Sequence, residues 1–250
     1  MKPKTSKTLL RNAAAVLFWT AAWALLSLLV NKPLLLPAPW TVLSRLWALL
    51  GTGTFWRCTL TSLLRVLTGV LSAAVLGVLL AAACTRWKLV DAAVAPLLTV
   101  VKSTPVASFT ILVLLWLRRE LTPALIAGLI VLPVVWANVA AGIRAIDPKL
   151  LELAEVCRLG RRRTLLRIRI PSVLPHFRAA LRSALGFGWK AGVAAEVLVL
   201  PRNSIGRMIY ESKLYLQTEE LFAWTLAVIL LSLAIERLLL RLLGKEGTHG

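Results

Sequence analysis

Residues 121–143 read LTPALIAGLIVLPVVWANVAAGI and contain no charged side chain. An α-helix rises about 1.5 Å per residue, so about 20 apolar residues cross the roughly 30 Å hydrocarbon core of a bilayer. This stretch is therefore long enough and apolar enough to form a transmembrane helix. It indicates that the chain folds in a lipid bilayer.

The overall composition agrees with this interpretation. Hydrophobic residues make up 58% of the 250 residues, charged residues make up 16%, and the mean hydropathy is +0.79. A soluble domain averages about 45–50% apolar and about 25% charged residues, so the excess apolar surface must face lipid. We predict an all-α, polytopic membrane helix bundle of about six transmembrane helices, forming a single domain over residues 1–250. The predicted spans are residues 12–31, 65–86, 92–117, 121–143, 179–200 and 221–243.

The net charge is +19, from 30 Lys and Arg residues against 11 Asp and Glu residues. Such a charge is typical of nucleic-acid binding or of the basic cytoplasmic loops of a membrane protein. The distribution favours the second, because six spans place the N-terminal tail, the loop after the second span, the loop 144–178 and the basic C-terminal end on one side. We predict a multi-pass protein of a bacterial plasma membrane, with both termini cytoplasmic and no nucleic-acid partner. The opposite side carries Lys32, Arg45, Arg57, Arg118, Arg119, Arg202, Arg207, Lys213, Glu211, Glu219 and Glu220.

The remaining polar residues do not form a catalytic or metal-binding set. Cys58, Cys84 and Cys157 are widely spaced, and the histidines are His176 and His249. This pattern supports neither a disulfide framework nor a zinc site. The sequence also lacks a GxxxxGK[ST] motif for binding ATP phosphates. It therefore predicts a protein that is not an enzyme and has no metal or cofactor of its own.

Small residues mark two faces where helices are expected to pack closely. One face recurs every fourth residue in the second span, and a GxxxG pair lies in the fifth span. Small side chains allow helix backbones to approach each other in membranes. We expect both faces to pack within the chain rather than between subunits. The residues are Gly69, Ala73, Gly77, Ala81, Gly188 and Gly192.

The basic loop 144–178 contains a short helix signal. Asp147 and Pro148 suit the N-cap and the first helical position, and Gly160 is expected to end the helix in a left-handed conformation. The residues between them, KLLELAEVCRL, place an apolar stripe on one face: Leu150, Leu153, Ala154 and Cys157. Such a helix is suited either to docking on another protein or to lying on anionic lipid.

Residues 147–175, DPKLLELAEVCRLGRRRTLLRIRIPSVLP, resemble the cytoplasmic "EAA" loop of the permease subunits of binding-protein-dependent ABC importers. The family pattern is Asp-Pro-x-Leu-x-Glu-Ala-Ala, then a Gly, then a hydrophobic residue and Pro. Leu153 replaces the first Ala of that pattern, and the Gly falls on Arg158, two residues before Gly160. The resemblance implies that this is a coupling helix, which inserts into a groove on a separate cytoplasmic ATPase subunit that binds the ATP. The implied coupling residues are Asp147, Leu150, Glu152, Leu153, Ala154, Cys157, Arg158 and Gly160.

Two further stretches are similar to the nitrate/sulfonate/taurine group of these permeases. They are LPAPWTVLSRLWALLGTGTFWRCTLTSLLRVLTGVLSAAVLGVLL at 36–80 and GWKAGVAAEVLVLPRNSIGRMIYES at 188–212. The resemblance implies the type I ABC importer permease fold and a dimer of the permease, formed by two copies of this chain. It also implies two cytoplasmic ATPase subunits and an extracytoplasmic substrate-binding protein as partners.

The charged residues inside the spans are candidates for the translocation path. Lys190 and Glu196 lie in the fifth span, and Lys102, Ser103 and Thr104 lie at a break that Pro96 and Pro105 make in the third. A Lys at the centre of a span costs roughly 2.5–3.5 kcal/mol, so it normally faces a partner or a watery cavity. The alternative is that polar groups of neighbouring spans neutralise Lys190 and Glu196.

In a dimer, two copies of Lys190 favour a small anion such as a sulfonate or nitrate as the substrate. Import of a neutral vitamin precursor by the same mechanism is the alternative. A secondary transporter is a further alternative, but the sequence shows no internal repeat of the kind such transporters use.

Overall fold

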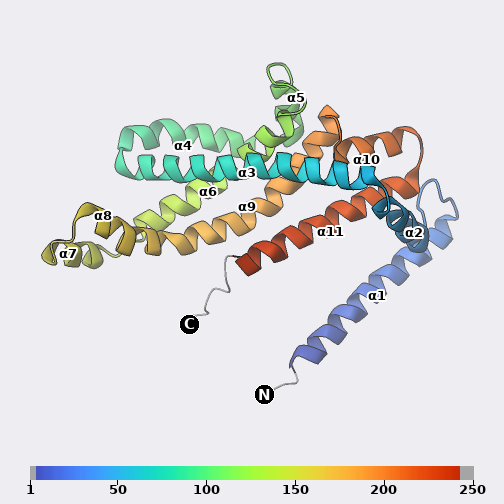
Figure 1. Cartoon of the computed structure of the whole chain (residues 1–250), viewed down its shortest axis with the longest axis horizontal. Coiled ribbons are helices and arrows are strands. Elements are labelled where there is room, and N and C mark those ends of the chain that lie inside the picture. The colour runs from blue at the N-terminus through green and yellow to red at the C-terminus, as the bar shows by residue number, and fades with distance from the viewer. Residues whose placement is uncertain (1–3, 243–250) are drawn as a thin grey trace.

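The computed structural model describes residues 4–242, and every regular element in that range is a helix (Figure 1). This confirms the predicted all-α fold. The two ends of the chain and the last residue of the predicted span 221–243 lie outside the described residues. The elements are α1 (Lys4–Val30), α2 (Pro39–Leu50), α3 (Gly53–Arg86), α4 (Lys88–Ser103), α5 (Val106–Val113), α6 (Thr122–Arg144), α7 (Pro148–Val156), α8 (Arg161–Thr164), the π-helical turn η1 (Leu165–Arg169), α9 (Ile170–Val199), α10 (Ile205–Leu214) and α11 (Thr218–Leu242).

The helices α3, α6 and α9 form the centre of the bundle. Their buried side chains are mostly Val and Ala, such as Val66 and Val70 on α3 and Val131 and Val135 on α6. The side chain of Trp189 on α9 is also buried there, and its Nε1 donates to the carbonyl of Val228 on α11 at 3.2 Å. The core therefore joins three of the predicted spans and holds α11 against them.

Glycine allows α3 and α6 to touch through their backbones. A Cβ atom added at Gly69 would overlap the backbone carbonyl of Ala124, and one at Gly128 would lie 2.9 Å from the carbonyl oxygen of Gly69. On α9, a Cβ at Gly188 would lie 2.8 Å from Val70 and 2.9 Å from Val131. These contacts confirm that the small-residue faces pack within the chain.

The third predicted span is broken at one of its two prolines. Pro96 lies inside α4, but α4 ends at Ser103 and α5 begins after Pro105, with an angle of 108° between the two helices. Thr104, just before the proline, is extended (φ −80°, ψ 128°). A residue before proline is pushed out of the helical region, and this explains the break.

The sequence predicts six spans, and the structure contains fewer helices that qualify as spans by length and apolar composition alone. Between residues 4 and 242, four helices are long and apolar enough to cross a membrane, or five if the bent pair α4–α5 counts as one span. The four are α1, α3, α6 and α11. The fifth predicted span lies in α9, which is continuous for 30 residues but carries Arg182, Lys190 and Glu196. Helix α9 is not among the helices that are recognised as apolar spans.

The basic loop and the opposite loops lie at different ends of the molecule. In Figure 1, α7 and α8 form one tip, and α2 and α10 lie at the other end. Helix α1 leaves the bundle beyond its contact with α11, where Trp23 stacks on Phe222 with ring centroids 6.0 Å apart. Most side chains of α1 from Ala13 to Val30 are exposed in the isolated chain, as expected of a helix that faces lipid or another subunit.

Candidate functional site

The start of α7 has the predicted cap. The side chain of Asp147 accepts a hydrogen bond from the backbone N–H of Lys149 at 2.9 Å, and Pro148 occupies the first helical position. The cap satisfies one of the free N–H groups at the helix start, and proline needs no hydrogen-bond acceptor there. The helix therefore begins at the residue expected from the sequence.

The end of α7 differs from the prediction, which assigned the left-handed residue to Gly160. Arg158 is the residue with positive φ (49°), whereas Gly160 is extended (φ −62°, ψ 153°) and precedes α8. The N–H of Leu159 donates to the carbonyl of Ala154 at 2.8 Å, and that of Arg158 donates to the carbonyl of Glu155 at 2.9 Å. These two bonds form a Schellman motif, which needs a left-handed residue at the position of Arg158.

The outer face of α7 is apolar and exposed. Leu150, Leu153 and Val156 are 42%, 57% and 81% exposed, and Cys157 is exposed beside them. Ala154, in contrast, is 2% exposed and faces the rest of the chain. The predicted stripe did not include Val156. Its spacing of three residues from Leu153 is the sequence signal that could have placed it on this face.

The loop carrying α7 leads into α9 through continuous helical structure. The turn η1 continues from α8 into α9 without a break. A π-helical turn of this kind often marks a functional site. At the other end of the loop, Arg144 at the end of α6 lies 3.6 Å from Asp91 in the first turn of α4.

Glu196 lies in a buried ion pair that joins three helices. Its side chain is fully buried, and its Oε1 lies 2.8 Å from Nη1 of Arg65 on α3. Its Oε2 accepts hydrogen bonds from Ser62 Oγ at 2.7 Å and from the N–H of Gly206 at 3.2 Å. Ser62 Oγ in turn accepts from the N–H of Ile205 at 3.0 Å. The carboxylate is thus neutralised by groups of α3 and of the start of α10. For Glu196, this agrees with the alternative that polar groups of neighbouring helices neutralise it.

Lys190 lies on a different face of α9. It is exposed, and it belongs to an exposed stripe that follows the helix every three or four residues. Between residues 4 and 242, no hydrogen bond or ion pair joins Lys190 to another side chain. It lies nine residues from the end of α9, about 14 Å along the axis, which places it deep in the span. The stripe consists of Ser183, Phe187, Lys190, Ala194 and Leu198.

The break in the third span is polar and partly exposed. Lys102 and Ser103 are exposed and Thr104 is half-buried. The hydroxyl groups of Ser103 and Thr104 donate to the carbonyl of Val100 in their own helix, at 3.1 and 2.7 Å. In the part of the chain that the structure describes, no hydrogen bond connects this break to Lys190 or to Glu196.

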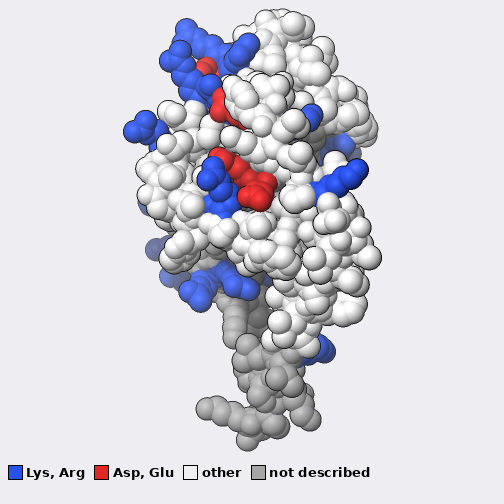
Figure 2. All heavy atoms as spheres, turned by 90° about the vertical axis from the view of Figure 1, so that its right-hand side faces the viewer, with Lys and Arg blue, Asp and Glu red and all other residues white. Residues whose placement is uncertain are grey.

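The end of the molecule opposite α7 carries acidic side chains. Figure 2 shows Asp and Glu side chains grouped near the middle of this face, with Lys and Arg beside them. Arg207 and Glu211 pair within α10 at 2.6 Å, and Arg45 of α2 pairs with Glu220 of α11. Both pairs are partly exposed, so this face offers charges of both signs to the surroundings.

Comparisons with known proteins agree with this arrangement. The sequence pattern of the family described as "Binding-protein-dependent transport system inner membrane component" matches residues 69–243, well over half of the chain. The taurine transport system permease protein TauC of Escherichia coli (strain K12) is 26% identical over 235 residues, which cover 92% of this chain and 85% of TauC. The riboflavin transport system permease protein RibX of Chloroflexus aurantiacus is 29% identical over 234 residues, which cover 90% of this chain and 86% of RibX.

A solved structure shares the fold. It is the crystal structure of a bacterial ABC transporter involved in the import of the acidic polysaccharide alginate. Its matching chain superposes with a TM-score of 0.64 at 18% sequence identity, covering 96% of this chain and 98% of the other. The two chains therefore share the same helical fold.

Proposed function

The chain belongs to the family of inner membrane components of binding-protein-dependent transport systems, and from this membership we propose how its parts divide the work of import. It is a permease subunit of an ABC importer and a multi-pass protein of the plasma membrane. In our proposal, α7 couples it to a separate ATPase subunit, and α9 lines the path of a small anion.

The coupling role of α7 is supported by its capped ends and its exposed apolar face. Asp147 and Arg158 hold a short, well-defined helix at the tip of the molecule (Figure 1). Leu150, Leu153 and Val156 would fill a groove on the ATPase, with Glu152 beside them. Closure of the ATPase pair on ATP would move α7 as a rigid body and rock the spans between inward-open and outward-open states.

The path role of α9 is supported by the exposure of Lys190, which is the observation that carries the proposal. A Lys facing lipid at the centre of a span costs roughly 2.5–3.5 kcal/mol, so this face of α9 needs a watery cavity or a partner. A second copy of the chain, facing α9 across such a cavity, would supply both. Two Lys190 side chains would then favour a small anion, and Lys102, Ser103 and Thr104 would add polar groups.

We also propose which surfaces meet the partners. With both termini in the cytoplasm, the basic loop around α7 meets the ATPase subunits. The face in Figure 2, with α2 and α10, then meets an extracytoplasmic substrate-binding protein. The charge distribution supports this orientation, because the long basic loop belongs on the cytoplasmic side.

The names of the relatives support two candidate substrates, an anion and a neutral vitamin. TauC is named for the transport of taurine, whose sulfonate group carries a negative charge, and this agrees with a path lined by Lys190. RibX is named for the transport of riboflavin, so a neutral vitamin or vitamin precursor is the second candidate substrate.

Transport by the reconstituted complex tests the path role. The permease, its ATPase and its binding protein are placed in liposomes, and uptake of taurine, nitrate and riboflavin is measured. We expect Lys190→Met to abolish anion uptake while the complex still assembles. Lys88→Met, which removes an exposed Lys at the start of α4, is the matched control and should transport normally. Unchanged uptake and unchanged substrate preference in Lys190→Met would contradict the path role.

ATP hydrolysis by the same complex tests the coupling role. We expect Glu152→Lys and Val156→Asp to abolish transport and transport-linked ATP hydrolysis without affecting membrane insertion. Glu155→Lys makes the same charge reversal farther from the exposed apolar face, about 100° around the helix from Val156 against about 40° for Glu152, so it should leave coupling intact. Full transport in both Glu152→Lys and Val156→Asp would show that α7 does not couple the two subunits.

A further inference from the structure

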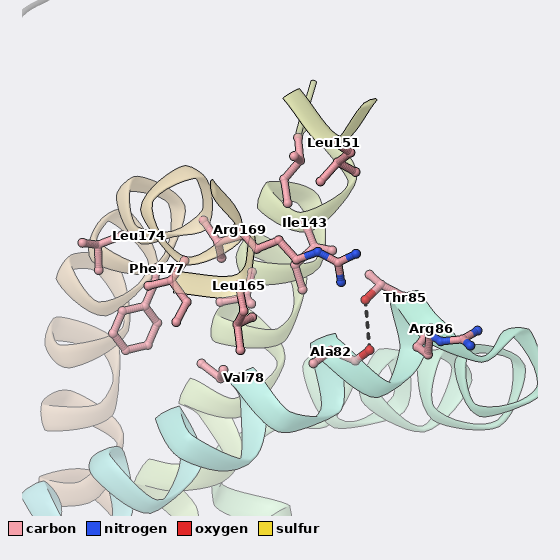
Figure 3. Close-up of a pocket in the computed structure, with 14 residues that line it drawn as sticks. Val78, Ala82, Thr85, Arg86, Ile143, Leu151, Leu165, Arg169, Leu174 and Phe177 are labelled. Carbon is pink, nitrogen blue, oxygen red and sulfur yellow. Dashed lines mark hydrogen bonds between the residues drawn. The ribbon is translucent and has the colours of Figure 1, made fainter. Parts of the chain in front are cut away.

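A cavity of about 660 Å³ opens at the end of the bundle that carries α7 (Figure 3). Its walls come from α3, α6, α7, η1 and the first turns of α9. The walls are mostly apolar, with Val78 and Ala82 on α3, Ile143 on α6 and Phe177 on α9. Large exposed apolar surfaces on a protein mark sites where a protein, a ligand or a membrane binds.

Two arginines stand at the cavity. Arg86 ends α3 and Arg169 ends η1, and both are exposed. Figure 3 shows the guanidinium of Arg169 reaching over the cavity toward Thr85. Arg86, the next residue along α3, points away from Arg169 in this view, and its long side chain would turn toward a bound anion. The hydroxyl of Thr85 donates to the carbonyls of Ala81 and Ala82 at 2.8 and 3.1 Å. Within residues 4–242, neither arginine forms an ion pair, so both guanidinium groups are available to an anion.

The apolar part and the charged part are stacked along the axis of α3. Val78 and Arg86 are separated by eight residues, about 12 Å along the helix. Trp87, directly after Arg86, is 56% exposed. Trp is enriched at the membrane–water interface, so the arginines lie at headgroup level and the apolar walls lie deeper.

We propose that this cavity binds one anionic phospholipid. Its phosphate would lie between Arg86 and Arg169, and an acyl chain would lie against Val78, Ala82 and Phe177. Basic pockets between membrane helices bind anionic headgroups in this way. The proposal goes beyond the transport function and does not depend on it; only the assignment of the lipid to the cytoplasmic leaflet rests on the orientation proposed above.

The lipid would also support the coupling loop. Leu151 of α7 and Leu165 of η1 line the same cavity, so an acyl chain there would fix the loop against α3 and α6. The exposed residues Leu150, Leu153 and Val156 do not line it, and they leave a separate surface for a protein partner. This separation favours lipid over a protein as the occupant.

Native mass spectrometry of the delipidated, full-length chain tests the proposal. Phosphatidylglycerol and phosphatidylcholine with identical acyl chains are added in separate titrations. We expect one phosphatidylglycerol per chain, bound about 30-fold more tightly than phosphatidylcholine, which is the factor that two arginines near an anionic surface supply. The double variant Arg86→Gln/Arg169→Gln should lose this preference. Arg161→Gln/Arg163→Gln, which removes the same charge from exposed α8, should keep it.

A second variant tests the apolar part of the cavity. Ala82→Trp fills the space and keeps both arginines, so we expect it to abolish the selective binding as well. Circular dichroism and size-exclusion chromatography check that each variant is folded. Equal phosphatidylglycerol binding in wild type and Arg86→Gln/Arg169→Gln, or undiminished binding in Ala82→Trp, would overturn the proposal. A third outcome is that the wild type shows no selective lipid binding and that Arg86→Gln/Arg169→Gln loses binding of the ATPase subunit. This would overturn the proposal and assign the cavity to a protein interface.

Discussion

At the scale of single residues, two arginines adopt arrangements that are unfavourable by themselves. Arg158 takes the left-handed conformation that a glycine adopts without strain, and Arg65 is paired with a carboxylate in the interior of the chain. In both places, neighbouring groups offset the unfavourable free energy. The Schellman hydrogen bonds fix the backbone of Arg158, and Glu196 neutralises Arg65.

Replacing Arg158 with Gly should stabilise the end of α7. The left-handed conformation costs a residue with a Cβ atom roughly 1–2 kcal/mol, and the entropy that Gly loses on folding offsets part of this gain. We expect a net gain of about 0.5–1 kcal/mol, which slows local hydrogen exchange at Leu159 roughly 2- to 5-fold. Hydrogen-exchange mass spectrometry measures it. Arg158→Ala keeps the Cβ atom and should show no gain; an equal gain in Arg158→Ala would refute the argument from conformation.

Replacing Glu196 with Gln should destabilise the bundle strongly. The change leaves the guanidinium of Arg65 in the interior without a counter-charge, and breaking a buried pair in this way costs about 3–5 kcal/mol. A clear drop in the thermal unfolding midpoint in detergent is expected.

The matched control for Glu196→Gln is Glu211→Gln. It breaks the partly exposed pair with Arg207 in α10, and an exposed pair four residues apart contributes only about 0.3–0.5 kcal/mol. If Glu196→Gln melts at the same temperature as Glu211→Gln, the buried pair does not stabilise the fold.

At the scale of helices, the crossing of α3 and α6 depends on direct backbone contact. Gly69 and Gly128 allow this approach, and the apolar side chains around them lie on both helices. In a membrane, helices associate largely through close packing because lipid is as apolar as their side chains. The loss of close approach is therefore not compensated by a hydrophobic driving force.

Gly69→Ala should separate α3 from α6. Its added Cβ atom would overlap the backbone of Ala124, which cannot rotate away as a side chain would. We expect a loss of about 3 kcal/mol, at the upper part of the usual range for overpacking, together with a lower yield of folded protein. Gly186→Ala is the control, because a Cβ atom there meets no neighbour within 4 Å. Comparable melting of the two variants would disprove the role of the close crossing.

At the scale of the whole molecule, the two ends of the bundle differ in charge and in shape. One end extends as the basic loop around α7, and the other end carries acidic side chains beside α10 (Figures 1 and 2). The positive-inside rule connects this asymmetry to an orientation in the membrane.

Cysteine labelling of intact cells should report this orientation. In a background free of Cys58, Cys84 and Cys157, we expect Arg162→Cys in α8 to be protected from an impermeant maleimide. Tyr215→Cys, after α10, should react. Both sites are exposed, so accessibility within the protein does not limit the reaction. External labelling at residue 162 would show that the orientation is inverted or that an odd number of spans precedes this residue.

The sequence alone was sufficient for the membrane environment of this protein and for the presence of its long helices. Runs such as residues 121–143 predicted spans that the structure contains as helices, because length and apolar composition determine which segments can satisfy their backbone in lipid. The capped start of α7 was also predictable, since Asp147 and Pro148 act on the backbone next to them. Pro105 likewise explains the bend between α4 and α5.

Only the tertiary structure decided which charged residues are satisfied within the chain. Glu196 and Lys190 lie six residues apart in the same helix, yet one is buried against Arg65 and the other is exposed. The left-handed residue at the end of α7 was assigned to Gly160 from composition, whereas the structure has it at Arg158. The periodicity of a helix shows which residues share a face but not which helix covers that face. The partner of a buried charge depends on contacts between segments far apart in sequence, as Glu196 and Arg65 do. The turn that ends α7 is set instead by two local hydrogen bonds, which the composition of the segment does not reveal.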